Sequence, residues 1–138
     1  MKEEIRLILF THGNLCFELL NVVKLILGEK VVIDSDIICL SNSELSLPSC
    51  IDLIRSKMKS IIDINNHSKF IVLTDLPGGS CFMASKKIEK EFEGLVSTIS
   101  GSNISIITSF ITKKKDQYIN LFQFTELLRG DGIRAINF

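Results

Sequence analysis

The chain has 138 residues and a mass of 15.5 kDa, which is long enough for one domain with a single hydrophobic core. Its sixteen basic and sixteen acidic side chains cancel, so no long-range field attracts nucleic acid or an anionic membrane. Mean hydropathy is positive, at +0.31, but no apolar run approaches the ~20 residues of a membrane-spanning helix, and the acidic start is unlike a signal peptide. We therefore expect one soluble, cytoplasmic domain over residues 1–138.

An apolar segment at residues 5–10 has the pattern of a strand that is buried on both faces of a parallel sheet. It is followed by His12 and then by Gly13, which allows a sharp turn into a helix predicted over residues 14–27. Apolar residues cover all of that helix except one polar stripe, so we expect it to be largely buried, and Gly28 ends it. His12 is therefore expected at the carboxyl end of a central strand, where ligands of open α/β sheets bind.

The next segments alternate between strand and helix patterns. A second strand is predicted within residues 31–40, although three polar residues interrupt it, and residues 41–46 read as a polar loop. Pro48 suits the first turn of a second helix, whose core positions are Ile51, Ile54, Met58, Ile61 and Ile62. A turn at residues 65–68 leads into a strand over residues 70–74.

The second half of the chain continues this alternation. Helices are predicted over residues 80–92, 104–114 and 117–129, a strand over 95–99, and a short terminal strand over 133–138 after Gly130 and Gly132. In the last helix we expect four side chains to point inward: Tyr118, Leu121, Phe122 and Leu128.

The alternation of strands and helices along the whole chain predicts an α/β fold, an open, doubly wound, mainly parallel sheet with helices on both faces.

The run of three lysines and the four cysteines could each indicate a binding site or an ordinary structural role, and we favour the structural role for both. Lys113, Lys114 and Lys115 close a helix favourably against its dipole, and in a neutral chain they do not make a nucleic-acid patch. The four cysteines lie far apart, with no Cys-x-x-Cys pair and no paired histidines, so spacing disfavours structural zinc and a redox pair. We expect reduced, mostly buried thiols at Cys16, Cys39, Cys50 and Cys81, and no metal site or cofactor.

The residues that could perform chemistry follow two of the predicted strands. His12 ends the first strand, and Asp75 ends the strand over residues 70–74. A carboxylate that holds one imidazole nitrogen as N–H leaves the lone pair of the other nitrogen free, which makes the histidine a nucleophile. We therefore expect Asp75 to orient the ring of His12.

Pro77-Gly78-Gly79-Ser80 follows Asp75 directly and precedes a predicted helix. Two glycines at a helix start allow backbone N–H groups to converge on an anion, and the Ser80 hydroxyl adds a donor; the alternative is a simple tight turn. The motif has no Gly-Lys-Ser/Thr, so it is not a nucleotide-hydrolysing loop. A nucleophilic histidine beside a phosphate cradle formed by Gly78, Gly79 and Ser80 suggests a phosphoryl group carried on the imidazole.

At this point the sequence resembles a known family, the IIA domain of the mannose (mannose–fructose–sorbose) family of the bacterial phosphoenolpyruvate-dependent sugar phosphotransferase system. The resemblance is carried by four segments in matching order and spacing: LFTHG at 9–13, LILGE at 25–29, LTDLPGGSCF at 73–82 and ISGSNI at 99–104. It extends from residue 5 to about residue 124. The combination of His-Gly with Asp-x-x-Gly-Gly-Ser is specific, whereas either half alone is weak.

The resemblance implies a phosphotransferase component that works through a phosphohistidine. His12 would take a phosphoryl group from HPr and pass it to a IIB domain for sugar uptake, so the protein would meet the membrane only through a IIC/IID transporter. The family further implies that Asp75 orients the imidazole, that the Gly-Gly-Ser segment lines the site, and that the protein is a homodimer in which a C-terminal strand packs across the subunit interface.

The chain departs from the family pattern at two positions near the site. Cys81 and Met83 stand where the family often has proline and asparagine. Losing the proline loosens the helix start without removing a chemical group, and Met83 removes any polar contact that the asparagine makes. The segment 31–46 matches poorly and does not identify a sugar.

Two alternatives to sugar transport remain open from the sequence. One is a related phosphoacceptor with a regulatory role, or the phosphotransfer subunit of a dihydroxyacetone kinase, using the same histidine. The other is a flavodoxin-like ligand-binding domain, which predicts no phosphorylation. The second histidine, His67, lies in an Asn-Asn-His-Ser turn and is not expected to be modified.

Overall fold

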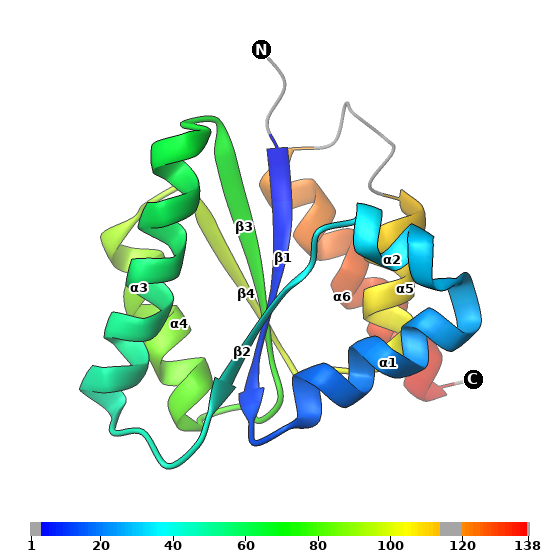
Figure 1. The fold of residues 1–138 in the computed structure, drawn as a ribbon, viewed down its shortest axis with the longest axis horizontal. Helices are drawn as coiled ribbons and strands as arrows, with labels where there is room; N and C mark the ends of the chain where they lie inside the picture. Colours follow the sequence, from blue (N-terminus) through cyan, green and yellow to red (C-terminus); the bar gives the residue numbers. More distant parts are fainter. Residues whose placement is uncertain (1–3, 114–119, 138) are drawn as a thin grey trace.

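The computed structural model describes residues 4–113 and 120–137 (Figure 1). In these residues the chain forms a four-stranded, all-parallel sheet in the order β2-β1-β3-β4. The strands are β1 (Glu4–His12), β2 (Ile38–Asn42), β3 (Ser68–Thr74) and β4 (Val96–Ser100). The two central strands are β1 and β3, as a doubly wound sheet requires, and the predicted α/β fold is confirmed.

Helices cover both faces of the sheet (Figure 1). On one face lie α3 (Leu47–Ile64) and α4 (Ser80–Glu91); on the other lie α1 (Leu15–Leu27), α2 (Glu29–Asp34), α5 (Ile104–Lys113) and α6 (Leu121–Asn137). None of these helices, within the described residues, has the length and apolar character needed to cross a bilayer.

Alternation along β1 explains the two layers. Leu7 and Leu9 are fully buried against the layer that contains α1, α5 and α6, while Ile8 and Phe10 are fully buried against α3 and α4. Successive side chains of a strand point to opposite faces, so His12 continues the series of Ile8 and Phe10. It therefore lies on the side of the sheet where α4 begins.

Side chains cap the starts of two helices. The hydroxyl oxygen of Ser46 accepts a hydrogen bond from the N–H of Ser49 at 3.3 Å, and Pro48 occupies the first turn of α3. Asn103 caps α5, because its Oδ1 accepts from the N–H of Ile106 at 2.9 Å. Both caps satisfy N–H groups that have no partner within a helix.

The segment 31–40 is not one interrupted strand. Gly28 takes a φ of +99°, which favours glycine, and the chain turns there into the short helix α2. The hydroxyl of Ser35 donates to the carbonyl of Val31 at 2.8 Å and helps to end this helix. The strand β2 begins only at Ile38, and it includes two residues of the predicted polar loop, because the sheet extends as far as the pair His12 and Asn42.

The predicted C-terminal strand is wrong for residues 133–137, which continue α6; the last residue of the chain lies outside the described residues. The helix runs through Gly130 and Gly132 instead of ending there. A Cβ atom at Gly132 would lie 2.8 Å from Cδ1 of Ile106, so this glycine permits close packing of α6 on α5. Gly132 therefore marks a close contact between two helices and not the end of a helix.

The inward side chains of α6 are partly as predicted. Leu121 and Leu128 are buried, but Phe122 is 72% exposed. Tyr118 and the first residues of the predicted helix lie outside the described residues, as do Lys114 and Lys115. Helix α6 begins after Asn120, whose side-chain oxygen accepts from the N–H of Gln123 at 2.8 Å.

Helix α1 is less buried than its sequence predicts. Cys16 and Val23 are fully buried, whereas Leu25 is 86% and Ile26 is 58% exposed. The single polar stripe therefore does not mark the only exposed side of this helix. Further apolar side chains are exposed beside them on α1 and α2: Leu15, Phe17, Val22, Val31 and Ile33.

Candidate active site

The candidate site lies at the carboxyl ends of three adjacent strands. In the sheet, His12 of β1 is paired in register with Asn42 of β2, and Phe10 is paired with Thr74 of β3. Asp75 therefore leaves β3 close to His12 although 63 residues separate them. Strand order reverses between β1 and β3, and this switch point is where open α/β sheets bind ligands.

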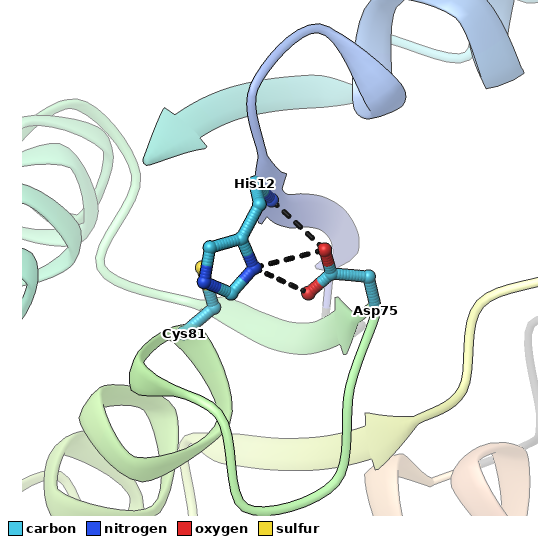
Figure 2. Close-up of side chains that lie close together, drawn as sticks. All are labelled: His12, Asp75 and Cys81. Carbon is cyan, nitrogen blue, oxygen red and sulfur yellow. Dashed lines mark hydrogen bonds and ion pairs between the residues drawn. The ribbon is translucent and has the colours of Figure 1, made fainter. Parts of the chain in front are cut away.

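Asp75 contacts His12 through both the backbone and the ring (Figure 2). Its Oδ2 accepts from the backbone N–H of His12 at 2.9 Å, and its carboxylate oxygens lie 3.0 and 3.2 Å from Nδ1 of the imidazole. A carboxylate only accepts hydrogen bonds, so Nδ1 carries the proton in the neutral ring. The lone pair is left on Nε2, as the sequence analysis expects.

The environment keeps Asp75 ionised. Burial favours the neutral carboxylic acid, but the hydrogen bonds from the backbone and the ring of His12 outweigh it, and the net effect is a lowered pKa for Asp75. Its side chain is 14% exposed, whereas that of His12 is 46% exposed. The site therefore has a shielded carboxylate behind an accessible imidazole.

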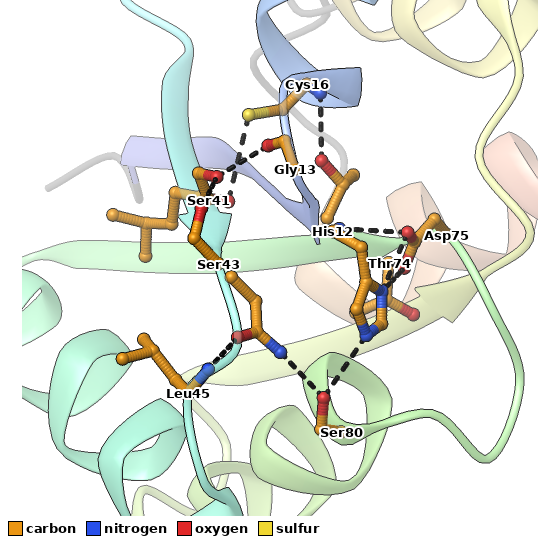
Figure 3. Close-up of polar contacts among 12 residues, drawn as sticks. His12, Gly13, Cys16, Ser41, Ser43, Leu45, Thr74, Asp75 and Ser80 are labelled. Carbon is orange, nitrogen blue, oxygen red and sulfur yellow. Dashed lines mark hydrogen bonds and ion pairs between the residues drawn. The ribbon is translucent and has the colours of Figure 1, made fainter.

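Ser80 approaches the other nitrogen of the ring (Figure 3). Its hydroxyl oxygen lies 3.3 Å from Nε2 of His12 and accepts from the side-chain amide of Asn42 at 2.7 Å. Asn42 is itself fixed, because its Oδ1 accepts from the N–H of Leu45 at 2.9 Å. Since the amide already donates to Ser80, the Ser80 O–H is directed toward Nε2.

The three predicted phosphate-binding residues have different places. Ser80 is the first residue of α4 and contacts the ring. A Cβ atom at Gly79 would lie 3.5 Å from Cε1 of His12 and 3.2 Å from the carbonyl oxygen of Leu76, so only glycine fits there without displacement. Gly78, with a φ of +80°, forms the turn. The N–H groups of the first turn of α4 have no helical partners and lie beside the site.

An open cleft of about 560 Å³ gives access to this arrangement; it is lined by His12, Gly13, Ser80 and residues 42–45. The loop after β2 is therefore one wall of the site. Sequence reasoning missed Asn42, which is only 4% exposed, because it assigned that segment to a polar loop. No pattern near Asn42 points to Ser80, which is 38 residues away.

Cys81 reaches the same site from the first turn of α4 (Figure 2). It is fully buried, and burial together with the negative charge of Asp75 raises the pKa of its thiol to about 12. The other three cysteines are also free thiols, as predicted; Cys16 and Cys50 are buried and Cys39 is half-buried.

His67 lies far from this site, in the turn that precedes β3. Its backbone N–H donates to the side chain of Asn65 at 3.0 Å, and its carbonyl accepts from Glu4 at the start of β1. It is thus at the amino ends of the strands, whereas His12 is at the carboxyl ends.

Comparisons with known proteins give structural matches only. No family model matches the sequence, and no curated protein matches it. The fold is similar to that of phosphotransferase system component EIIA from Streptococcus agalactiae, with a TM-score of 0.77 and 20% identity over 95% of this chain and 94% of that one.

Two proteins from Enterococcus faecalis share the fold as well. The mannose/sorbose-specific IIA subunit of the phosphotransferase system aligns with a TM-score of 0.75 and 22% identity, over 98% of this chain and 92% of that one. A sigma-54 interaction domain protein aligns with a TM-score of 0.74 and 13% identity, over 99% and 96%. At these identities the matches establish the fold, and the chain has the fold of IIA components.

Proposed function

We propose that this protein is a phosphocarrier of the sugar phosphotransferase system. In this proposal Nε2 of His12 accepts a phosphoryl group from the phosphohistidine of HPr and passes it to a IIB domain. The observation that carries the proposal is the contact of 3.0 Å between Nδ1 of His12 and Asp75, because it leaves the lone pair on the accessible nitrogen. The fold shared with IIA components supports it.

The transfer needs no net proton movement within the site. The Nε2 lone pair of His12 attacks phosphorus, the new N–P bond forms as the N–P bond of the donor breaks, and the donor imidazole leaves with the electron pair. The acceptor ring then has a substituent on each nitrogen and carries positive charge. Asp75, held ionised beside Nδ1, stabilises that charge.

The phosphoryl oxygens meet donors that are already in place. The Ser80 hydroxyl, 3.3 Å from Nε2, can turn from the nitrogen to a phosphoryl oxygen once the lone pair is used. The free N–H groups and the dipole at the start of α4 also favour the anion. Exchange between two histidines is nearly balanced in energy, so these donors suffice and we expect no requirement for metal or nucleotide.

The test is phosphorylation by phosphoenolpyruvate, enzyme I and HPr, followed by intact mass. We expect one added phosphoryl group, labile in acid and stable in base as a phosphoramidate is. His12→Ala should lose it. His67→Ala is the matched control, since the chain has only two histidines, and it should be labelled fully. Undiminished labelling of His12→Ala would contradict the proposal.

A second candidate uses the same chemistry with another acceptor. The similarity of fold to a sigma-54 interaction domain protein favours a regulatory phosphoacceptor, and a phosphotransfer subunit of a dihydroxyacetone kinase belongs to the same class. The two candidates differ in what receives the phosphoryl group. Transfer from phosphorylated protein to a purified mannose-family IIB domain supports sugar transport, and retention of the label with that domain supports the regulatory role.

A further inference from the structure

The phosphocarrier proposal gives Cys81 no role, although this thiol lies at the site. Figure 2 shows its sulfur behind the imidazole of His12, with Asp75 on the Nδ1 side of the ring. One donor atom from each of these three side chains lies within 4.8 Å of the other two. Nitrogen, oxygen and sulfur donors from three separate elements of the chain thus converge on one small volume.

This donor set matches one class of metal ion. Imidazole and thiolate are ligands of zinc, and a carboxylate completes a three-residue set that leaves a fourth position open. Magnesium and calcium prefer oxygen donors alone. Donors bound to one tetrahedral zinc ion lie roughly 3.3–3.8 Å apart. The present separations run from 3.0 Å between Nδ1 and Asp75 to at most 4.8 Å, so zinc binding would widen the short contact slightly and shorten the longest separation by about 1 Å.

We propose that His12, Asp75 and Cys81 form a zinc site whose occupation blocks the phosphoacceptor nitrogen. The nitrogen that faces the carboxylate is Nδ1, so zinc shared with Asp75 binds there. The Cys81 thiol loses its proton to solvent and binds as thiolate. The ring gives up the Nδ1 proton and takes one on Nε2, so one proton is released for each zinc ion bound.

The consequence follows from the second nitrogen. A ring that carries zinc on Nδ1 and a proton on Nε2 has no lone pair with which to attack phosphorus. Zinc and the phosphoryl group therefore exclude each other on the same imidazole. Zinc binding does not depend on the proposed phosphocarrier function, whereas inhibition of phosphorylation by zinc rests on that function.

Cobalt(II) is the probe of binding, because a cysteine thiolate gives it a charge-transfer band in the near ultraviolet and tetrahedral geometry gives it intense visible bands. We expect the reduced, unphosphorylated protein to bind one cobalt ion with both features, and zinc to displace it. Cys81→Ala should lose the thiolate band. Cys50→Ala is the matched control, since Cys50 is also fully buried on the α3–α4 side of the sheet, and it should keep the band.

A wild-type protein without the thiolate band overturns the zinc site, and so does a band that persists in Cys81→Ala. Should Cys81→Ala fail to fold by circular dichroism, the wild-type titration still decides, together with release of one proton per zinc in weakly buffered solution. No proton release overturns the ligand assignment.

The second arm measures phosphorylation by phospho-HPr. Excess zinc should slow labelling of the wild type at least tenfold and EDTA should restore it, whereas Cys81→Ala should respond to zinc severalfold less in the same donor mixture. Equal inhibition of both proteins overturns the blocking role. If neither protein accepts a phosphoryl group with EDTA present, the phosphocarrier proposal fails while the cobalt result stands.

Discussion

At the scale of single residues, Asp75 makes two contacts with His12 that one substitution separates. Its carboxylate accepts from the backbone of His12 at 2.9 Å and from the ring at 3.0 Å. An asparagine retains the shape and can still accept from the backbone. Its amide can present either oxygen or NH₂ to the ring, so Nε2 no longer has a dependable lone pair.

We therefore predict that Asp75→Asn slows phosphorylation by phospho-HPr on the order of a hundredfold. In a hydrolase triad the same change costs roughly ten-thousandfold, and the loss here is smaller because the imidazole of a phosphocarrier must also be a good leaving group. Rapid-quench labelling gives the rate, and a urea titration should show a nearly unchanged free energy of unfolding. Labelling at the wild-type rate would make Asp75 a turn residue only.

Asn42 gives a second prediction, because its amide directs the Ser80 hydroxyl. Asn42→Asp replaces the donating NH₂, 2.7 Å from Ser80, with an accepting oxygen, and the hydroxyl then turns toward residue 42. Ser80→Ala removes the hydroxyl altogether. We expect each variant to slow phosphorylation on the order of tenfold, less than an oxyanion-hole donor contributes, since the phosphoryl group is already charged.

The double variant is the control for this coupling. If both substitutions act through one hydroxyl, Asn42→Asp with Ser80→Ala should be about as slow as the slower single variant. Losses that multiply would show that Asn42 acts on its own. Heteronuclear NMR of His12 should meanwhile show the proton on Nδ1 in all variants that keep Asp75.

At the scale of elements, the sequence predicted those features that depend on neighbouring residues, such as the starts of helices. The cap of α3 at Ser46 and the cap of α5 at Asn103 are short-range hydrogen bonds, and the sequence predicted both helix starts, the first of them from Pro48. Gly132 was misread as a helix end, because its meaning depends on Ile106 across the interface between two helices. Helix α2 was missed because a six-residue helix has little periodicity of its own.

The same division holds for the site. His12, Asp75 and Ser80 could be predicted because each lies at a strand end or helix start that the apolar pattern locates. The positions of Asn42 and Cys81 at the site could not, because they arise from the folded chain: β2 is paired with β1 as far as Asn42, and the first turn of α4 places Cys81 behind the ring of His12. The absence of a metal-binding spacing therefore did not exclude donors that meet only in the folded chain.

Asp131 links the C-terminal helix α6 to α5 through an ion pair, and its contribution to stability can be tested. Its carboxylate, 10% exposed, pairs with Lys113 of α5 at 2.6 Å and with Arg134 in α6. Burial raises its pKa, but hydrogen bonds from Lys113, Ser109 and Arg134 outweigh this and lower it. We predict that Asp131→Asn destabilises the protein by about 1–2 kcal/mol at neutral pH.

The pH dependence of that loss has a definite sign. A carboxyl group with a lowered pKa in the folded state stabilises the protein above its unfolded pKa, and the contribution disappears as the pH falls through the folded pKa. The difference between wild type and Asp131→Asn in urea titrations should therefore be constant near pH 7 and shrink below the ordinary range of an aspartate. A difference that grows on acidification would contradict the pairing.

At the scale of the whole molecule, the exposed apolar side chains of α1 and α2 offer a surface for the homodimer that the family resemblance implies. This expectation comes from the family resemblance and from a C-terminal strand that is not present in residues 133–137, so we propose a different contact surface. Leu25 and Ile26, at 86% and 58% exposure, lie in the largest group of such side chains that adjacent helices carry within residues 4–113 and 120–137. We predict a dimeric mass by light scattering at micromolar concentration, and a monomeric mass for Leu25→Asp.

A matched control for this surface is Ile64→Asp. Ile64 is 89% exposed at the end of α3, on the opposite side of the sheet, so an acidic residue there should leave the dimer intact. Both variants should fold, since neither side chain is buried. A monomeric wild type rejects the dimer, and equal dissociation by the two substitutions rejects the assignment to α1.

The pairing of β1 with β3 also has a consequence for the folding of the newly synthesised chain. His12 is synthesised 63 residues before Asp75, and the two meet only when non-local parallel pairing closes the intervening chain, which is a slow class of folding event. Until then the imidazole exchanges freely between its tautomers. Under the phosphocarrier proposal, a nascent or misfolded copy that lacks this pairing has no fixed tautomer at His12 and is a poor acceptor of the phosphoryl group.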